Sequence, residues 1–335
     1  MHLIYVLGLF ASLFAPFTSE AAPAQMRALL MTGYGSSDVL RLDRIPVPAP
    51  AAGEVRIRVH AASINPIDWK IRSGQLQKYY PVSLPYIPGR DVAGIVEAVG
   101  SNVTRWKAGD HVFAVLDGGG LAEYVNAPAE NVALKPAKLS FEEAAGIPTA
   151  SLAAWRTLIG NADLKAGQRV LIHGGAGGVG STAVQLAHWR GAHVIATASL
   201  RNHEYLKTIG ADEVIDYRNT RFEDVAQNVD VVLDTLGGDT LERSPAVLRD
   251  GGTLLSIVAV PPVQACSERK LRCPNPSTAT QEQPGEELTK LAQLFETGAL
   301  KISIQAEFPL EQAAKAMELS ETERARGKII VRVIE

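Results

Sequence analysis

The chain has 335 residues, of which 46% are hydrophobic, and its formal net charge is −3. This length and apolar content favour two folded domains with sizeable cores. No block of Lys or Arg stands out, so the composition argues against nucleic acid or an anionic membrane surface as a partner. The two cysteines, Cys266 and Cys273, are too few for a disulfide framework or a four-thiolate zinc site.

Residues 1–25 form an extension that precedes the first domain. Its apolar run, LIYVLGLFASLFAPF, is short for a transmembrane helix and is followed by small residues, as in a signal peptide cleaved after Ala21 or Ala24. No Lys or Arg precedes this run, however, and Met26 already opens a sequence typical of a domain start. Export and a cytoplasmic start at Met26 are therefore both open.

Residues 26–148 predict a β-rich domain. The stretch EVRIRVHAASI alternates apolar and polar residues as a half-buried strand does, and VAGIVEAVG and DHVFAVLDGGG are further short runs bounded by Gly or Asp. The last strand, KIIVRVIE, is expected to rejoin this domain. The domain then also includes residues 284–335, with two amphipathic helices, GEELTKLAQLFETGAL and FPLEQAAKAMELS.

Residues 149–283 alternate between strands and helices. VLIHG and HVIATAS are predicted strands, STAVQLAHWRG and HEYLKTIG are predicted helices, and EVIDY, VDVVLDTLG and TLLSIVAV are further strands. Such alternation predicts a parallel sheet with helices on both faces. The polar segment 261–285 is broken by proline and predicts a loop.

Gly175, Gly177 and Gly180 form a G-x-G-x-x-G motif between a predicted strand and a predicted helix. In this context Gly175 allows a tight turn, Gly177 lets the backbone approach a pyrophosphate, and Gly180 lets helix and strand pack closely. The N–H groups at the start of the helix then face the phosphates. The other cofactor candidates in this turn are Gly178, Val179 and Ser181.

The second strand of this unit ends without the carboxylate that binds the ribose hydroxyls in NAD sites. Ser199 stands there and can hydrogen-bond a 2′-phosphate, while Arg201 can pair with one bidentately. The sequence therefore predicts NADPH as cofactor; the alternative is a solvated Arg201 and a site indifferent to the phosphate. Tyr217 is a candidate for closing over the adenosine, with edge packing as its alternative. Further cofactor candidates are Asn202, Gly237 and Val258.

Several motifs follow one another along residues 26–335: SINPIDWKIRSG, YIPGRDVAGIVEAVG, WKAGDHVFA, GGLAEYV, HGGAGGVGSTAVQLA, GADEVIDY, DVVLDTLGG and ARGKIIVRV. Together they resemble the zinc-independent medium-chain dehydrogenases/reductases, and among these the zeta-crystallin-like quinone oxidoreductases. The resemblance implies an α/β protein in which a GroES-like β-barrel catalytic domain, built from both chain ends, carries an inserted Rossmann dinucleotide-binding domain. The cofactor is expected in the cleft between them, and a homodimer is the expected assembly.

The zinc-dependent relatives carry a Cys ligand near the position of Asn65 and a G-H-E motif. Here the matching residues are Asn65 and Gly89-Arg90-Asp91, so the Cys and the His are missing and no metal site is expected. Without a Lewis acid, the chemistry must rest on the cofactor and on positioning. A quinone or an α,β-unsaturated carbonyl suits such a site because it accepts hydride readily.

The resemblance also implies the catalytic candidates Asn65, Asp68 and Lys70. In the family the Asn of S-x-N-P-x-D lies by the nicotinamide, and this role carries over to Asn65. Asp68 is expected to relay a proton or orient a group, or alternatively to form a turn or a salt bridge with Arg72. Lys70 stands where many quinone oxidoreductases have Tyr; it is expected to hold a carboxamide or donate a proton, or alternatively to be a solvated surface lysine.

Two segments depart from the family pattern. Leu152-Ala153-Ala154-Trp155 replaces L-T-A-W, so a hydroxyl near the cofactor is missing unless Thr149 or Ser151 supplies it. The stretch CSERKLRCPNPSTATQ stands where relatives have an apolar strand with aromatic residues. This second departure puts both the lining of the nicotinamide pocket and the dimer edge in doubt.

Three functions compete. The first is NADPH-dependent reduction of a quinone or enone. The second is 2-enoyl thioester reduction, whose branch resembles G-N-Y after N-P-x-D; here Gly74-Gln75-Leu76 matches, with Tyr79 and Tyr80 nearby. The third is an NADPH-binding structural or redox-sensing protein with little turnover. A disulfide between the two cysteines would favour export and a redox-sensing role; the alternative is two unrelated loop thiols.

Overall fold

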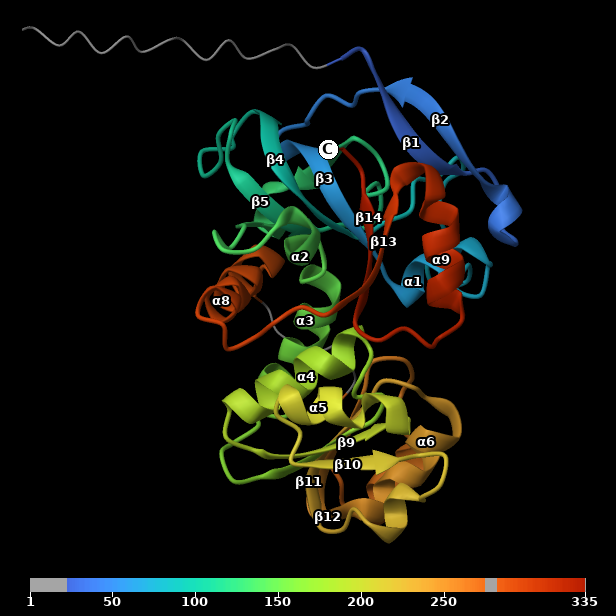
Figure 1. Ribbon diagram of the computed structural model, residues 1–335, viewed down its shortest axis with the longest axis vertical. Coiled ribbons are helices and arrows are strands. Elements are labelled where there is room, and N and C mark those ends of the chain that lie inside the picture. Colours follow the sequence, from blue (N-terminus) through green and yellow to red (C-terminus); the bar gives the residue numbers. More distant parts are fainter. Residues whose placement is uncertain (1–22, 275–281, 335) are drawn as a thin grey trace, which may run out of the picture.

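The computed structural model describes residues 23–274 and 282–334 (Figure 1), so the predicted signal-peptide-like segment lies outside the described residues except for its last three positions. Two main sheets organise the chain, one in the upper and one in the lower part of Figure 1, and helix α3 (Pro148–Trp155) lies between them. In the described ranges no helix is long and apolar enough to cross a membrane.

The upper part contains a seven-stranded sheet and a two-stranded ribbon. The ribbon pairs β1 (Gln25–Met31) with β2 (Leu40–Pro46). The sheet has the order β13-β14-β3-β4-β5-β7, with β6 also paired to β3. Its strands are β3 (Glu54–Ile64), β4 (Asp91–Val99), β5 (His111–Val115), β6 (Tyr124–Pro128), β7 (Val132–Leu134), β13 (Ile304–Pro309) and β14 (Lys328–Arg332).

Strand β14 pairs with β3, as expected for the C-terminal strand. The pairing puts residues from the two ends of the chain side by side. The helices of this part are α1 (Pro66–Arg72), α2 (Phe141–Ala145), α8 (Pro284–Glu296) and α9 (Ala313–Glu321). One expectation was wrong: Phe308 and Pro309 end β13 and do not belong to the helix that follows.

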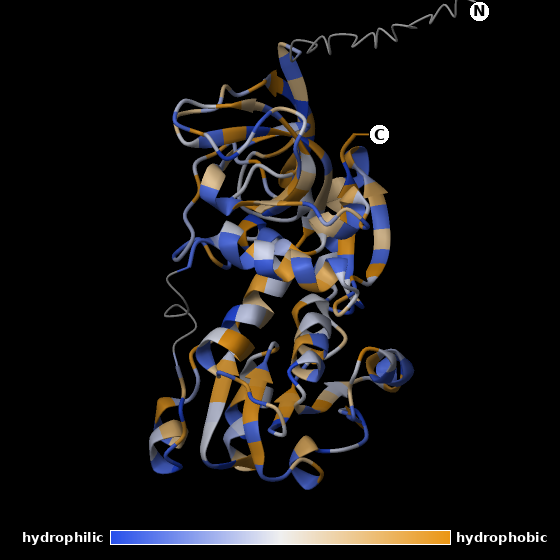
Figure 2. Cartoon of the chain, turned by 90° about the vertical axis from the view of Figure 1, so that its left-hand side faces the viewer, coloured by the Kyte–Doolittle hydropathy of each residue, from blue (hydrophilic) through white to orange (hydrophobic). Residues whose placement is uncertain are grey.

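The lower part is a five-stranded parallel sheet in the order β10-β9-β8-β11-β12, the arrangement of a Rossmann sheet. Its strands are β8 (Arg169–Ile172), β9 (His193–Ala198), β10 (Glu213–Asp216), β11 (Val229–Asp234) and β12 (Leu248–Ser256), and its helices are α4 (Gly178–Trp189), α5 (His203–Thr208) and α6 (Gly238–Arg243). Figure 2 shows these strands coloured mainly as hydrophobic, consistent with a sheet covered on both faces.

The junction between the two parts runs through α3, which continues into a π-helical turn (Arg156–Asn161). The predicted boundary between residues 148 and 149 therefore falls at the start of a helix. Helix α3 packs against α4 of the lower part and against α8 of the upper part. These contacts hold the glycine-rich turn close to the upper sheet.

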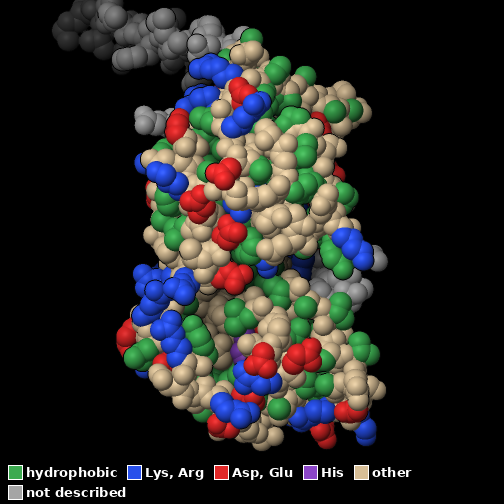
Figure 3. All heavy atoms as spheres, turned by 90° about the vertical axis from the view of Figure 1, so that its right-hand side faces the viewer, with side chains coloured by type: hydrophobic (Ala, Val, Ile, Leu, Met, Phe, Trp, Pro, Cys, Tyr) green, Lys and Arg blue, Asp and Glu red, His purple; other side chains and the backbone are tan. Residues whose placement is uncertain are grey.

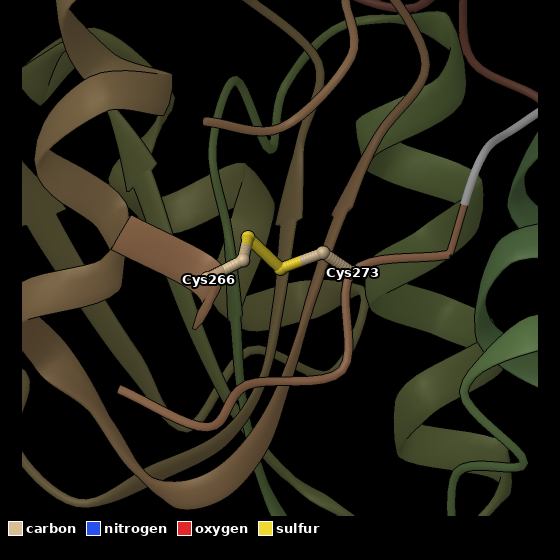
Figure 4. Close-up of a disulfide and its surroundings, with 2 residues drawn as sticks. All are labelled: Cys266 and Cys273. Atoms are coloured by element: carbon tan, nitrogen blue, oxygen red, sulfur yellow. A yellow bond between two sulfur atoms is a disulfide. The ribbon is translucent and has the colours of Figure 1, made fainter. Parts of the chain in front are cut away.

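The segment predicted as a loop, 261–285, contains a short helix, α7 (Val263–Glu268), and a disulfide between Cys266 and Cys273 (Figure 4). The disulfide lies beside the open edge of the lower sheet, where Arg272 forms a single parallel bridge with Thr253 of β12. Periodicity missed this arrangement because six residues are too few to establish a helical pattern.

Replacing both cysteines with serine is expected to lower the free energy of unfolding by about 2 kcal/mol, because the cross-link restricts a loop in the unfolded chain. Urea unfolding of the double variant and of the oxidised wild type measures this difference. Reduced wild type is the control and should behave like the variant. An intact mass that does not rise by two hydrogens on reduction would contradict the disulfide.

Candidate active site

The glycine-rich turn connects β8 to α4. Its left-handed residue is Gly174, with φ of 67°, so assigning the tight turn to Gly175 was wrong. A Cβ on Gly175 would lie 2.9 Å from the Ala196 Cβ, which shows that this glycine instead lets the turn pack on β9. A Cβ on Gly180 would lie 2.2 Å from the Gly174 carbonyl oxygen, so helix and turn touch at that point, as expected.

The N-terminus of α4 faces this turn, with Gly177 as its N-cap residue. A Cβ on Gly177 would lie no closer than 3.5 Å to another atom, so this position is open on the side away from the protein. The first N–H groups of a helix have no acceptors within the helix and bind anions well. Gly178 and Val179 are the first two residues of α4, and the Ser181 hydroxyl donates to the Gly178 carbonyl over 3.2 Å.

A buried histidine, His173, directly precedes the glycine-rich turn and contacts the residues around it. His173 Nδ1 lies 3.2 Å from Thr197 Oγ1, which also accepts the Gly174 N–H, and its Nε2 lies 3.2 Å from Ser244 Oγ. Because the Ser244 hydroxyl donates to the Thr240 carbonyl, Nε2 carries the imidazole hydrogen. Burial lowers the pKa of His173 to about 3, and this side chain therefore remains neutral.

A cavity of about 290 Å³ opens at the carboxyl ends of β8, β9 and β10. Figure 3 shows a hollow between the two parts of the molecule, with Lys and Arg side chains gathered beside it. Tyr217, a predicted cofactor residue, lines the cavity and is 58% exposed. The other lining residues include His173, Thr197, Arg218, Phe222, Thr240 and Arg243.

The end of β9 places Ser199, Arg201 and Asn202 together. The Asn202 side-chain amide donates to Ser199 Oγ over 3.4 Å, and both residues are buried. Arg201 is exposed, and its Nη2 donates to the Arg324 carbonyl over 3.0 Å. This contact brings the loop 322–327 of the upper part against the turn after β9, and Arg326 lies over the ring of Tyr205 in α5 at 5.3 Å.

Gly237 and Val258 lie next to each other beyond β11 and β12. Gly237 has φ of 76°, and a Cβ there would lie 3.0 Å from the Val258 side chain. Asp234 holds this corner by accepting the Gly237 N–H over 2.9 Å and the Ser256 hydroxyl over 3.0 Å. The structure thus brings both candidates to the carboxyl ends of the strands, the same end of the sheet as the glycine-rich turn.

Asn65 lies at the start of α1 in a buried polar cluster. Its Oδ1 accepts from Lys328 Nζ over 2.6 Å, and its Nδ2 donates to Asp91 Oδ2 over 2.9 Å. Asp91 Oδ1 also accepts the backbone N–H and the hydroxyl of Thr149, over 3.0 and 2.5 Å. Of the two hydroxyls suggested as substitutes for the missing Thr, that of Thr149 is thus engaged, while Ser151 Oγ is buried without a partner among the described residues.

Lys328 and Asp91 form a buried ion pair with 3.6 Å between Nζ and Oδ2. Burial lowers the pKa of Lys328, while the carboxylates of Asp91 and Asp68 oppose this shift. Neither residue was predicted from the sequence to have a role in the site. The available signal was a charged residue at the start of each apolar strand, in KIIV and in DVAGIV.

Asp68 accepts the N–H of Asn65 over 2.8 Å and that of Gly89 over 3.1 Å, so it caps α1 and ties it to the start of β4. The alternative pairing with Arg72 was wrong, because Arg72 pairs with Glu321 over 2.8 Å. Burial raises the pKa of Asp68 to about 6, with a further contribution from Asp91, while the two N–H groups oppose the shift.

Asp68→Asn is expected to change how stability depends on pH. Because the folded-state pKa lies above the ordinary 3.8, the folded protein binds the Asp68 proton more tightly than the unfolded chain does. The stability of wild type relative to the variant should then fall by an amount on the order of 2 kcal/mol as pH rises from about 4 to about 6. Denaturant unfolding across this range measures it, and a difference that grows with pH contradicts the assignment.

Lys70, the third catalytic candidate, is half-buried on α1, with its Nζ 5.3 Å from the centroid of the Trp69 ring. This contact places the ammonium beside the indole ring of the neighbouring residue. The structure therefore does not place Lys70 in the cluster that holds Asn65 and Asp68. Over the described ranges, no group of three or more His, Cys, Asp or Glu side chains is placed to hold a metal ion.

The chain matches two known domain families. Residues 51–137 match the "Alcohol dehydrogenase GroES-like domain", and residues 209–331 match the family described as "Zinc-binding dehydrogenase". The 2-methylene-furan-3-one reductase of Solanum lycopersicum is 39% identical over 95% of this chain and 81% of its own length. The quinone oxidoreductase of Homo sapiens is 34% identical over 91% of this chain and 97% of its own length.

A solved structure agrees with these matches. The crystal structure of Escherichia coli quinone oxidoreductase complexed with NADPH superposes with a TM-score of 0.83 at 30% identity, covering 92% of this chain and 100% of the other. A GroES-like domain joined to a Rossmann sheet with this glycine-rich turn defines an NAD(P)H-dependent oxidoreductase. The chain belongs to the quinone oxidoreductase (zeta-crystallin-like) family of the medium-chain dehydrogenase/reductase superfamily.

Proposed function

We propose that this protein transfers a hydride from NADPH to a quinone or an α,β-unsaturated carbonyl, without zinc. The observation that carries the proposal is that three groups of candidate residues meet where the upper and lower parts of the molecule are in contact. There the glycine-rich turn, the carboxylate-free end of β9 and the buried Asn65 cluster lie around one junction: Gly327 donates to the Ala176 carbonyl over 2.9 Å, and Arg201 donates to Arg324. The relatives named for a quinone and for a methylene-furanone support this pair of acceptors.

The residues at this junction fit the successive parts of NADPH. The N-terminus of α4 offers N–H groups to the pyrophosphate, and Gly177 leaves room for it. Ser199 and Arg201 offer a hydroxyl and a guanidinium to the 2′-phosphate. The cavity lined by Tyr217 would receive the adenine, Gly237 and Val258 would border the cofactor, and Asn65 would bind at the nicotinamide end.

Bound NADPH supplies the hydride, so the chain has to orient the acceptor and manage one proton. Asn65 would orient the reacting end through its side-chain amide, held in place by its buried partners. Asp68 acts on this arrangement by fixing the start of α1. Solvent would then deliver the proton that completes reduction of the acceptor, because Lys70 lies outside the Asn65 cluster.

Two measurements test the proposal. The purified protein is titrated with NADPH and with NADH, and the loss of reduced-nicotinamide absorbance is then followed after a small quinone or a conjugated enone is added. Tight NADPH binding with acceptor-dependent oxidation is the expected result. Turnover with a 2-enoyl thioester alone would favour the competing 2-enoyl thioester reductase. The tyrosines nearest to the position of its proton donor, Tyr79 and Tyr80, are 71% and 47% exposed. Binding without turnover on any acceptor would contradict the proposed reaction.

Arg201→Ala is expected to weaken NADPH binding by about tenfold and to leave NADH binding nearly unchanged, because one charge-assisted pair with the 2′-phosphate is lost. Dissociation constants for both cofactors measure the effect. Arg41→Ala, which removes an exposed arginine from β2 of the upper part, is the matched control and should change binding of neither cofactor. Equal losses for both cofactors would rule out the phosphate contact.

A further inference from the structure

We propose that Lys328 is a positioning residue for hydride transfer and that it acts through the side-chain amide of Asn65. The inference rests on the proposed function, because it concerns how the nicotinamide end of the site is oriented. Lys328 is the first residue of β14, more than 260 positions away from Asn65 in sequence, and is 5% exposed.

Lys328 determines which way the Asn65 amide points. An ammonium has donors and no acceptor, so the group 2.6 Å from Nζ must be the amide oxygen. The amide nitrogen then faces Asp91 Oδ2 at 2.9 Å, and a carboxylate accepts this hydrogen bond. A flipped amide would place its NH₂ group against the ammonium and its oxygen against the carboxylate, so the two charges together favour one orientation strongly.

This orientation leaves one donor of Asn65 for a ligand. Nδ2 carries two hydrogens, and within the described residues the structure gives it one acceptor, Asp91. The second hydrogen can therefore bind an acceptor such as the nicotinamide carboxamide oxygen. Without the ammonium, the amide keeps Asp91 but loses one of the two charged partners that fix its orientation, so this donor is held less firmly.

Lys328 also connects Asn65 to the glycine-rich turn. The preceding residue, Gly327, donates to the Ala176 carbonyl and forms a bridge with Gly177. A Cβ on Gly178 would lie 3.1 Å from Lys328 Cδ, so the lysine stem packs directly against the turn. The same side chain thus contacts the N-terminus of α4 with its stem and the catalytic amide with its ammonium.

A double-mutant cycle tests the inference. The variants are Lys328→Met, which retains the unbranched stem, Asn65→Ala, and the combination of the two. Lys328→Met is expected to lower kcat about tenfold in the wild-type background, with a smaller change in KM for NADPH, and to have little effect in the Asn65→Ala background. A purely structural role would lower activity by the same factor in both backgrounds, and that result would overturn the proposal.

Lys135→Met is the matched control, because Lys135 is also partly buried but donates to the carbonyls of Pro136 and Leu139 away from the site. It should not be coupled to Asn65. If Lys328→Met does not fold, Lys328→Met with Asp91→Asn removes both buried charges, and adding Asn65→Ala to that pair should again change kcat little. A further loss as large as in wild type would overturn the proposal.

The same cycle is measured on the dissociation constant of NADPH, which separates this inference from the proposed function. If neither a quinone nor an enone supports NADPH oxidation by wild type, the proposed function fails. Non-additive losses of NADPH binding would still support a Lys328–Asn65 coupling in that case. Additive losses in both binding and turnover would show that Lys328 does not act through Asn65.

Discussion

Gly180→Ala is expected to reduce NADPH affinity by about a hundredfold or more. The new Cβ would lie 2.2 Å from the Gly174 carbonyl oxygen and 2.8 Å from the Gly175 Cα, and neither backbone atom can move without shifting the turn. The same clash should lower the free energy of unfolding by about 1–3 kcal/mol. Fluorescence titration with NADPH and denaturant unfolding measure the two effects separately.

Gly177→Ala is the matched variant. Its Cβ would meet no atom closer than 3.5 Å, and its φ of −74° suits alanine, so the stability of the protein should not change. NADPH affinity should nevertheless fall, because the methyl group would occupy space that the pyrophosphate needs. Unchanged binding in the Gly180 variant would show that this turn does not hold the cofactor.

Asp91→Ala is expected to destabilise the protein by about 3 kcal/mol or more. The substitution leaves the Lys328 ammonium buried without its carboxylate, and it removes the acceptor of two hydrogen bonds from Thr149. Asp91→Asn should cost less, because the amide oxygen can still accept from Thr149 or Lys328. Urea unfolding of both variants at neutral pH measures the difference.

An exposed ion pair provides the control for this comparison. Asp239 pairs with Arg243 over 2.9 Å, and its side chain is 83% exposed, so Asp239→Ala should unfold within experimental error of wild type. An Asp91→Ala protein as stable as that control would show that the buried pair contributes no net stabilisation. It would also argue against a Lys328 side chain held rigidly beside the glycine-rich turn.

The sequence alone predicted the parallel sheet, the glycine-rich turn and the carboxylate-free end of β9. These features follow from local patterns: apolar strands alternate with helices, and the motif from Gly175 to Gly180 lies between a strand and a helix. Their physical basis is short-range, since strand and helix periodicities act within a few residues and the turn needs glycine where atoms of the same segment crowd each other.

The tertiary structure decided which polar groups meet. Asn65, Asp91, Thr149 and Lys328 come from four separate elements. The pairing of β3 with both β4 and β14, together with the packing of α3, brings them together. The structure likewise put Asp68 on two backbone N–H groups and not on Arg72, and it put Lys70 outside the cluster. Local patterns do not predict such contacts, because a buried charge finds its partner through the packing of distant segments around it.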